Sequence, residues 1–227
     1  MNIDKLKSIA VVICAGGVSK RFGVKKEYQK IDSDTTVLGM VVKTFSEINS
    51  IDTIAIAIPK DGENEARKAL PQEFLNSIKP KLLFCEGGET RQASVYNALR
   101  SLEQFNPGFV LIHDGARPFI SASLIKSVIE AAQKHGAAIP VLSLTDTPKE
   151  HDGKFITHHL KRVNTGIAQT PQGFKFAEIL QAHEKAAELT GEEFTDDAEV
   201  WGKFCGDVAV VPGETANKKI TFKEDLI

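Results

Sequence analysis

The chain has 227 residues, 42% of them hydrophobic and 26% charged, which suits one large α/β domain and excludes a disordered chain. A formal net charge of -2 excludes a general attraction to nucleic acid or membrane, so any basic patch must be local. The sequence holds no apolar run of about 18 residues, as a membrane-spanning helix requires, and its N-terminus, MNIDKLKS, lacks the apolar core of a signal peptide. The three cysteines are far apart, and we expect them to be reduced core thiols of a cytoplasmic protein.

Strand-like and helix-like segments alternate through the first 141 residues, which predicts a mostly parallel, twisted sheet flanked by helices. The expected strands span residues 9–14, 53–58, 81–85, 109–113 and 137–141. The helices expected between them span residues 37–48, 64–75, 90–102 and a segment from an N-capping Ser123 to residue 134.

The pattern changes at residues 142–160, where two β-prone stretches flank Asp152-Gly153. Asp-Gly in this setting predicts a hairpin, and we interpret the segment as a β-arm that projects from the single domain 1–227. Because a protruding hairpin cannot bury itself, we expect it to pack on a second subunit and form a homodimer. Beyond the arm we expect a helix at 174–189, a short helix near Thr195, and strands at 208–211 and 219–222.

The first strand leads into a glycine-containing basic loop, in which Ala15-Gly16-Gly17 is followed by four cations within seven residues, Lys20, Arg21, Lys25 and Lys26. Small residues after a buried strand allow close approach of a ligand and leave N–H groups for anions. A nucleoside triphosphate is therefore the expected ligand, although the loop matches neither the Walker pattern nor the dinucleotide-binding pattern. An ordinary strand-to-loop turn with solvated lysines is the alternative.

Two further strand ends carry polar groups, and ligands of open α/β sheets bind beyond such ends. One is the Gly87-Gly88 turn, which leads through Arg91 into a helix, and the other is Asp114, which follows His113. A carboxylate beside a triphosphate loop is a candidate Mg²⁺ ligand, because Mg²⁺ takes one or two carboxylates together with phosphate oxygens. A turn cap is the alternative for Asp114, and we expect His113 to be a partly buried strand residue rather than a base.

These motifs and two later ones occur in one order at suitable spacings: Ala15-Gly16-Gly17-x-x-x-Arg21, Lys26, Gly87-Gly88-x-x-Arg91-x-x-Ser94-Val95, His113-Asp114-Gly115-Ala116-Arg117-Pro118, Gln169-Thr170-Pro171-Gln172 and Asn217-Lys218-Lys219-Ile220-Thr221. The ordered set resembles the 2-C-methyl-D-erythritol 4-phosphate cytidylyltransferase family, over residues 9–226. The resemblance implies a Rossmann-like nucleotidyltransferase fold. It also implies transfer of CMP from CTP to 2-C-methyl-D-erythritol 4-phosphate with release of pyrophosphate, in non-mevalonate isoprenoid synthesis.

The resemblance also implies roles for individual residues. Arg21 and Lys26 would neutralise the triphosphate, and Asp114 would hold Mg²⁺. The nucleotide would be bound by the residues that line the two glycine turns, which are Ala15, Gly16, Gly17, Gly87, Gly88, Arg91 and Ser94, with Ser94 in direct contact with cytosine. The acceptor phosphate would be bound by Arg117, by Thr147 and Arg162 from the arm across the dimer, and by Thr195 and Lys219, of which Arg162 and Lys219 would also act in catalysis.

Several residues keep a second interpretation. Asp196-x-x-Glu199 is a capping box, so Thr195 would then only flank a helix. Arg91 would then hold the glycine turn, Ser94 would face a neighbouring helix, and Arg162 would be a solvated strand residue. Either Lys25 or Lys26 suits the triphosphate, with spacing in favour of Lys26.

The chain departs from the family at three places: Ser19 replaces a second glycine, Glu27 follows the loop lysines, and the sequence stops at Ile227 where relatives continue into a helix. Two other functions remain open. One is transfer to ribitol 5-phosphate or another polyol phosphate, which differs only in the acceptor pocket. The other is a catalytically silent nucleotide-binding scaffold, which would be expected to have lost the metal carboxylate or the loop cations.

Overall fold

The computed structural model describes residues 8–17, 22–23, 25–189 and 191–226, and it contains a central sheet between two layers of helices. The strand order is β10-β5-β9-β4-β1-β2-β3, with β8 paired to β5 at one end. The parallel strands are β1 (Ile9–Cys14), β2 (Ile51–Ile58), β3 (Lys81–Glu86), β4 (Phe109–Asp114), β5 (Ala137–Ser143) and β10 (Ala209–Pro212). The expected α/β class and the mostly parallel sheet are confirmed.

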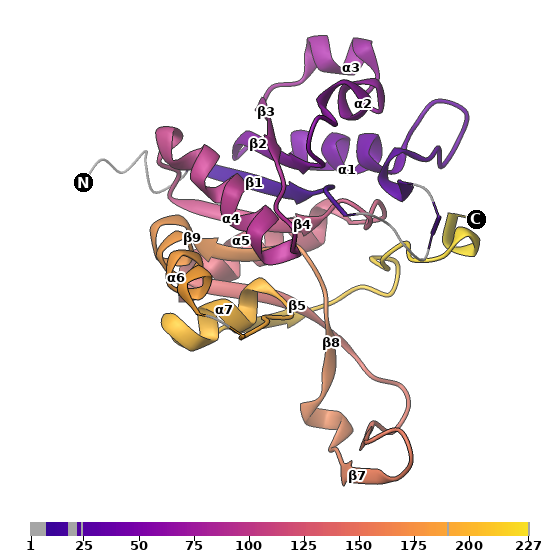
Figure 1. Cartoon of the computed structure of the whole chain (residues 1–227), viewed down its shortest axis with the longest axis vertical. Helices are drawn as coiled ribbons and strands as arrows, with labels where there is room; N and C mark the ends of the chain where they lie inside the picture. The colour runs from indigo at the N-terminus through magenta and orange to yellow at the C-terminus, as the bar shows by residue number, and fades with distance from the viewer. Residues whose placement is uncertain (1–7, 18–21, 24, 190, 227) are drawn as a thin grey trace.

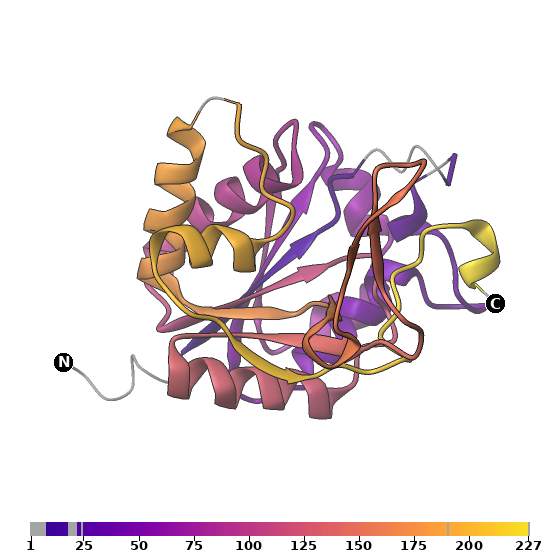
Figure 2. The ribbon, with the colours of Figure 1, turned by 90° about the horizontal axis from the view of Figure 1, so that it is seen from below.

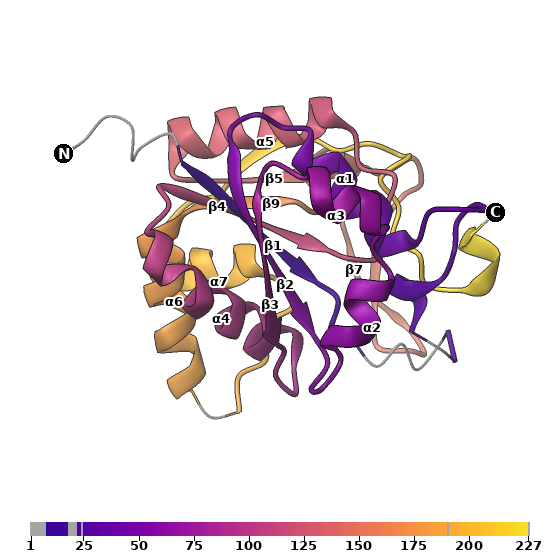
Figure 3. The ribbon, with the colours of Figure 1, turned by 90° about the horizontal axis from the view of Figure 1, so that it is seen from above.

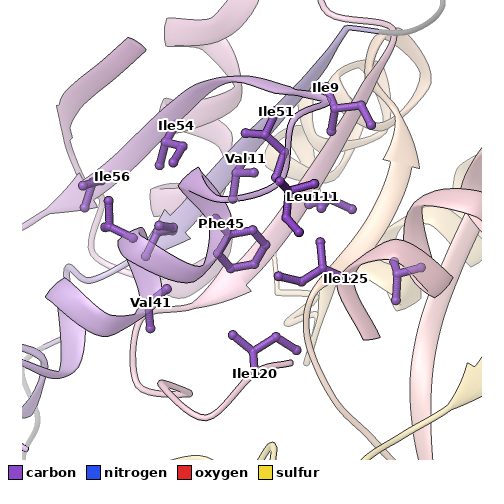
Figure 4. Packing of buried hydrophobic residues seen from close by; sticks show 14 of the residues in the cluster. Ile9, Val11, Val41, Phe45, Ile51, Ile54, Ile56, Leu111, Ile120 and Ile125 are labelled. Carbon is purple, nitrogen blue, oxygen red and sulfur yellow. The ribbon is translucent and has the colours of Figure 1, made fainter. Parts of the chain in front are cut away.

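Each face of the sheet is covered by its own helices, as the view from above shows (Figure 3). One face packs on α1 (Val37–Ser46) and α5 (Ala122–His135), and the other on α4 (Arg91–Leu102), α6 (Phe176–Glu188) and α7 (Asp197–Phe204). Because side chains alternate along a strand, Val11 of β1 enters the first layer and Val12 enters the second. Figure 4 shows Phe45 of α1 in the first layer, among isoleucines and valines of β1 and β2.

Two helices differ from their predicted bounds. The segment expected as one helix at 64–75 forms α2 (Glu63–Lys68) and α3 (Gln72–Ser77), because Pro71 has no N–H for a helical bond and favours an extended residue before it. The N-cap of α5 is Ser121 rather than Ser123, since the Ser121 hydroxyl accepts a hydrogen bond from Leu124 N at 3.0 Å.

A short antiparallel strand, β9 (Gln172–Lys175), replaces the expected start of a helix at Phe174. It lies between β4 and β5 and pairs with both, so α6 begins only at Phe176. Four residues with a central glycine carry no readable periodicity, and tertiary pairing decides their conformation. The strand expected at 219–222 is also wrong, because these residues form a loop before the 3₁₀ turn η5 (Lys223–Leu226).

The projecting arm is present and points away from the body (Figure 1), so that in the view from below it lies in front of the body (Figure 2). Its hairpin consists of β6 (Lys149–His151) and β7 (Ile156–His159), and the Asp152 carboxylate accepts hydrogen bonds from Lys154 N and Phe155 N in the turn. A 3₁₀ turn, η4 (Arg162–Asn164), leads into β8 (Gly166–Ala168), which pairs with the end of β5. The side chains of β6, β7 and β8 are all exposed, as expected for a hairpin that does not bury itself.

Along the described part of the chain, none of the helices has both the length and the apolar character needed to cross a bilayer. All three cysteines are free thiols. Cys14 and Cys85 are partly buried, but Cys205 is exposed where α7 ends, so the expectation of a core position is wrong for that residue.

Candidate active site

A cavity of about 490 Å³ lies beyond the carboxyl ends of the parallel strands, where the sequence predicted a ligand site. It is lined by residues that follow β1, β3 and β4, together with the loop that returns from β10. The lining residues are Cys14, Gly16, Gly17, Phe22, Lys26, Glu27, Gly88, Glu89, Thr90, Arg91, Ser94, Asp114, Ala116, Lys219 and Thr221. This volume is in the range of small-molecule and cofactor sites.

Asp114, at the end of β4, lies at the centre of a cluster of three cations. Its Oδ1 is 3.4 Å from Arg91 Nε, and its Oδ2 is 3.3 Å from Arg117 Nε and 3.0 Å from Lys219 Nζ. The Asp114 side chain is only 10% exposed. Burial alone raises the pKa of this carboxyl, but Lys219, Arg91 and Arg117 outweigh burial and hold the pKa well below its usual range. Asp114 is therefore ionised at neutral pH.

The loop at 213–222 is fixed by buried amide side chains, and this position brings Lys219 to Asp114. Asn217 donates from Nδ2 to the Thr170 carbonyl at 2.8 Å, and Gln169 donates from Nε2 to the Asn217 carbonyl at 3.2 Å. Ile220 N donates to Ala116 O at 2.8 Å. Two residues after the buried Asn217, Lys219 lines the cavity, whereas Lys218 is not among the lining residues.

The Gly87-Gly88 turn is tied to the start of α4 by Ser94. The Ser94 hydroxyl accepts from Gly88 N at 3.0 Å and donates to the Thr90 carbonyl at 2.8 Å. A Cβ on Gly88 would lie 2.4 Å from the Ala93 side chain, so this close packing requires glycine. At Gly17, by contrast, a Cβ would meet nothing within 4 Å among the described residues, which do not include residues 18–21.

The two adjacent loop lysines have different surroundings. Lys26 lines the cavity and donates from Nζ to Ile220 O at 2.8 Å, whereas Lys25 forms an ion pair with Glu65 at 3.2 Å. The choice of Lys26 over Lys25 therefore agrees with the geometry. Glu27 is buried and also lines the cavity. Arg21 and Ser19 lie outside the described residues.

His113 is fully buried behind Asp114 and is not placed to act as a base in the cavity. Its Nδ1 is 3.0 Å from the Thr170 hydroxyl, which accepts from Asp114 N, and its Nε2 is 3.1 Å from the Arg117 carbonyl. A carbonyl can only accept, so Nε2 carries the ring proton. Burial lowers the pKa of His113 to about 4, which keeps the ring neutral. Burial also raises the pKa of Cys14 to about 12, so its thiol is not an activated nucleophile.

Most of the predicted nucleotide residues come together, and most of the predicted acceptor residues do not. Ala15 and Gly87 are next in sequence to glycines that line the cavity. Arg117 is not a lining residue, but its Nε is 3.3 Å from Oδ2 of Asp114, which lines the cavity. Thr147 and Arg162 lie on the exposed arm, where Arg162 Nη1 donates to the Thr145 carbonyl at 2.6 Å. Thr195 donates from Oγ1 to Glu199 Oε2 at 2.8 Å, which agrees with the alternative that Thr195 flanks the capped start of a helix.

Sequence reasoning missed one charged partner of the site, Asp197 at the start of α7. Its Oδ2 is 2.7 Å from Arg91 Nη2, and its side chain is 1% exposed. The capping box places an acid at the start of this helix, but nothing in the sequence indicates that Asp197 faces Arg91. Glu27, noted in the sequence as a departure from the family, and Thr221, the last residue of a family motif, also line the cavity, although no role was assigned to either. Phe22 lines it without a signal in the sequence that singles it out.

The comparison with protein families decides which group this fold and cavity belong to. The family model described as 2-C-methyl-D-erythritol 4-phosphate cytidylyltransferase, IspD, matches residues 9–227. The chain belongs to this family. The cytidylyltransferase family was the one indicated by the ordered motifs of the sequence.

Similar proteins of the same family extend over nearly the whole chain. A bifunctional enzyme IspD/IspF of Bartonella henselae is 36% identical over 96% of this chain and 55% of its own length, and one of a Bradyrhizobium species is 39% identical over 97% of this chain and 55% of its own. The chain thus spans about half the length of these curated relatives.

Solved structures of single IspD enzymes match at nearly full length. The 2-C-methyl-D-erythritol 4-phosphate cytidylyltransferase of Thermus thermophilus has a TM-score of 0.76 at 34% identity, covering 96% of this chain and 95% of that one. The 4-diphosphocytidyl-2C-methyl-D-erythritol synthase of Anaerococcus prevotii has a TM-score of 0.84 at 29% identity, covering 100% of this chain and 96% of that one.

Proposed function

We propose that this protein transfers CMP from CTP to 2-C-methyl-D-erythritol 4-phosphate and releases pyrophosphate. The observation that carries the proposal is the cluster of cations around Asp114 at the ends of parallel strands, in a chain of the IspD family. Lys26, Arg91 and Lys219 line one cavity, which suits a polyanionic nucleotide. The intact carboxylate and described cations are not what a silent scaffold would be expected to keep.

The chemistry needs charge neutralisation rather than a base. The acceptor is a phosphate monoester whose second pKa is about 6, so it is largely dianionic near neutral pH. One of its oxygens attacks the α-phosphorus of CTP, the new P–O bond forms, and the bond to the bridging oxygen of pyrophosphate breaks. No proton has to be removed, which agrees with the buried neutral His113 and the protonated thiol of Cys14. Such transfers are catalysed mainly by positioning and electrostatics.

The described cations suit different parts of this reaction. Lys26 and Lys219 reach the cavity from opposite segments of the chain and would neutralise phosphate oxygens of the nucleotide. Arg21, outside the described residues, would add to them. Arg91 would bind the nucleotide from the first residue of α4, and Arg117, which lies beside Asp114, would turn toward the acceptor phosphate and orient it.

The glycine turns would hold the nucleoside. Among the described residues, none would clash with a Cβ at Gly17, and a glycine there would let the nucleotide approach the backbone closely. Ser94 ties the Gly87-Gly88 turn to the start of α4, and the backbone of this turn would face cytosine. Ser94 lines the cavity, and its side chain would contact cytosine directly.

Asp114 fits a Mg²⁺ ion that is shared with the nucleotide. Among the described residues, no group of three or more His, Cys, Asp and Glu side chains could hold a metal alone. A single carboxylate suffices where phosphate oxygens complete the ligand set, and this is how Mg²⁺ is usually bound. When bound, the ion would withdraw charge from the phosphates. Asp114 would be its protein ligand, with Lys219 and Arg117 turning toward phosphates.

The arm supports a proposal for a homodimer. Five large apolar side chains are exposed on it, Phe155, Ile156, Leu160, Val163 and Ile167, and Val163 is 89% exposed. A two-stranded hairpin with no apolar face of its own buried needs a packing partner. A second copy of this chain would bury these residues and bring Arg162 and Thr147 of the arm to the acceptor site of its neighbour. We place the protein in the cytoplasm, where its free thiols stay reduced.

The test is an acceptor assay with purified protein, CTP and Mg²⁺. We expect pyrophosphate release with 2-C-methyl-D-erythritol 4-phosphate and little release with ribitol 5-phosphate. Release with ribitol 5-phosphate alone would reject the acceptor, and no release with any polyol phosphate would reject the activity.

A further inference from the structure

The carboxylate of Asp197 is buried between two side chains at the start of α7. Its Oδ2 is 2.7 Å from Arg91 Nη2, and its Oδ1 is 3.2 Å from Nε2 of the fully buried His183 on α6. Burying a carboxylate without an opposite charge beside it is strongly unfavourable, so the ion pair with Arg91 helps to make the burial of Asp197 possible. Burial by itself raises the pKa of Asp197, but Arg91 and then His183 outweigh burial and keep the pKa low.

Asp197 is held rigidly relative to the sheet, although it does not line the cavity itself. Gln172 of β9 donates from Nε2 to Asp196 Oδ2 at 2.7 Å and accepts from Ala198 N at 3.0 Å, so it fixes the residues on both sides of Asp197. The Asp196 side chain also accepts from Glu199 N and caps α7. Asp197 occupies the first helical position, where the helix dipole favours a negative charge.

Of the two ion pairs that Arg91 makes with described residues, the shorter is with Asp197. The contact with Asp114 is long, at 3.4 Å, and involves only Nε, whereas the contact with Asp197 is 2.7 Å and involves Nη2. Within the described residues no hydrogen bond of Nη1 is recorded. With Asp197 holding one side, the guanidinium keeps donors for an anion in the cavity that it lines.

The two carboxylates that pair with Arg91, Asp114 and Asp197, have different roles. If Arg91 depended on Asp114 alone, any ligand that engaged Asp114 would also release Arg91. Asp197 provides a second, permanently buried negative charge on the side away from the cavity. Arg91 can then stay in place while Asp114 changes partners.

We propose that Asp197 is a positioning residue, which fixes the Arg91 guanidinium at the cavity so that it can bind the phosphates of CTP while Asp114 engages other groups. This inference rests on the proposed function, in which the cavity takes CTP. The chain Gln172–Asp196–Asp197 would thereby connect the central strand β9 to the nucleotide through Arg91.

The variant Asp197→Asn tests this because it keeps the volume and removes the charge. A matched control is Val200→Ala on the same helix, which removes buried packing and changes no charge. Arg91→Met and the double variant complete a cycle that isolates the coupling of the two residues. The readouts are calorimetric titration with CTP, the KM for CTP and kcat, and the side-chain ¹⁵N resonances of Arg91, assigned by their loss in Arg91→Met.

We expect Asp197→Asn to weaken CTP binding about tenfold, as for loss of one charge-assisted hydrogen bond, whereas Val200→Ala lowers Tm without this effect. In the Arg91→Met background, Asp197→Asn should have no further effect on CTP binding. The Arg91 resonances should broaden or exchange faster in Asp197→Asn even without nucleotide.

Equal loss of CTP affinity in both Arg91 backgrounds, or unchanged Arg91 resonances in Asp197→Asn, would overturn the inference. Wild-type protein that fails to bind CTP would reject the proposed function instead, and the resonances would still decide whether Asp197 holds Arg91.

Discussion

Replacing Asp114 by Asn should reduce the stability of the protein as well as its activity, because the carboxylate holds three cations together. Removing one partner of a buried charge cluster typically costs about 3–5 kcal/mol. Here each cation keeps another stabilising interaction. Arg91 retains Asp197 at 2.7 Å, Arg117 donates to the Asn217 carbonyl at 2.9 Å, and the Lys219 side chain is 40% exposed to water. The loss should therefore lie at the low end, about 3 kcal/mol, with Lys219 contributing least.

This loss is measurable as a shift in melting temperature. In a chain of this size about 1 kcal/mol shifts Tm by about 2–4 °C, so Asp114→Asn should melt about 6–12 °C below the wild type at neutral pH. The assay is differential scanning calorimetry, with the exposed Asp52→Asn as a control for removing one negative charge. Turnover should be lost in Asp114→Asn at temperatures where the variant is folded.

The pH dependence gives the sign of the effect independently. The folded protein holds the pKa of Asp114 below that of an unfolded chain, so the stabilisation is complete above the ordinary carboxyl pKa of about 4. It is lost as the pH falls from there toward the lower, folded pKa. The difference in Tm between the two proteins should accordingly be constant near neutrality and shrink by about pH 3. A variant that melts at or above the wild-type temperature at pH 7 would refute this account of the cluster.

Three further predictions concern the cations, the metal and the arm. Lys26→Met should reduce kcat/KM for CTP by about 10²-fold or more, whereas Lys25→Met, which loses the ion pair with Glu65 and a cation–π contact with Tyr28, should change it little; steady-state kinetics would expose the reverse order. Mn²⁺ observed by electron paramagnetic resonance should bind about tenfold more tightly with CTP present than without it. Lys219→Met should strengthen the binding of Mn²⁺ alone, because the Lys219 ammonium then no longer pairs with the Asp114 carboxylate. Equal Mn²⁺ binding with and without CTP would argue against a shared site. Val163→Glu should shift the protein from dimer to monomer in sedimentation equilibrium while leaving its circular dichroism unchanged, and a wild type that sediments as a monomer would reject the arm as an interface.

The sequence predicted those parts of the site that depend on strand ends. Asp114 follows His113 at the end of a strand that begins with the apolar residues 109–112, and the glycine turns follow two other strands, so their meeting at one edge of the sheet could be inferred from the alternation of strands and helices alone. The predicted hairpin at Asp152-Gly153 was also local, because the turn chemistry is contained in the residues themselves.

The parts that sequence reasoning missed depend on contacts between distant segments. β9 has no periodicity of its own and becomes a strand because β4 and β5 leave a place between them. A strand was expected at 219–222, but the segment is a loop, and the buried amide of Asn217 sets the direction of Lys219. The division of the helix expected at 64–75 is different, because Pro71 is a local signal that the prediction of one continuous helix overlooked.

The charge arrangement explains why the reactants and the site depend on one another. Asp114 and Asp197 are both buried, and together they balance most of the positive charge of Arg91, Arg117 and Lys219. A polyanion that draws Lys219 and Arg117 to its phosphates leaves the Asp114 carboxylate short of positive charge, and a divalent cation carried by that polyanion restores the balance. Because Asp197 keeps Arg91 in place throughout, only part of the cluster has to rearrange. Binding of nucleotide and metal should therefore be mutually strengthening, and the free protein should bind either one weakly alone.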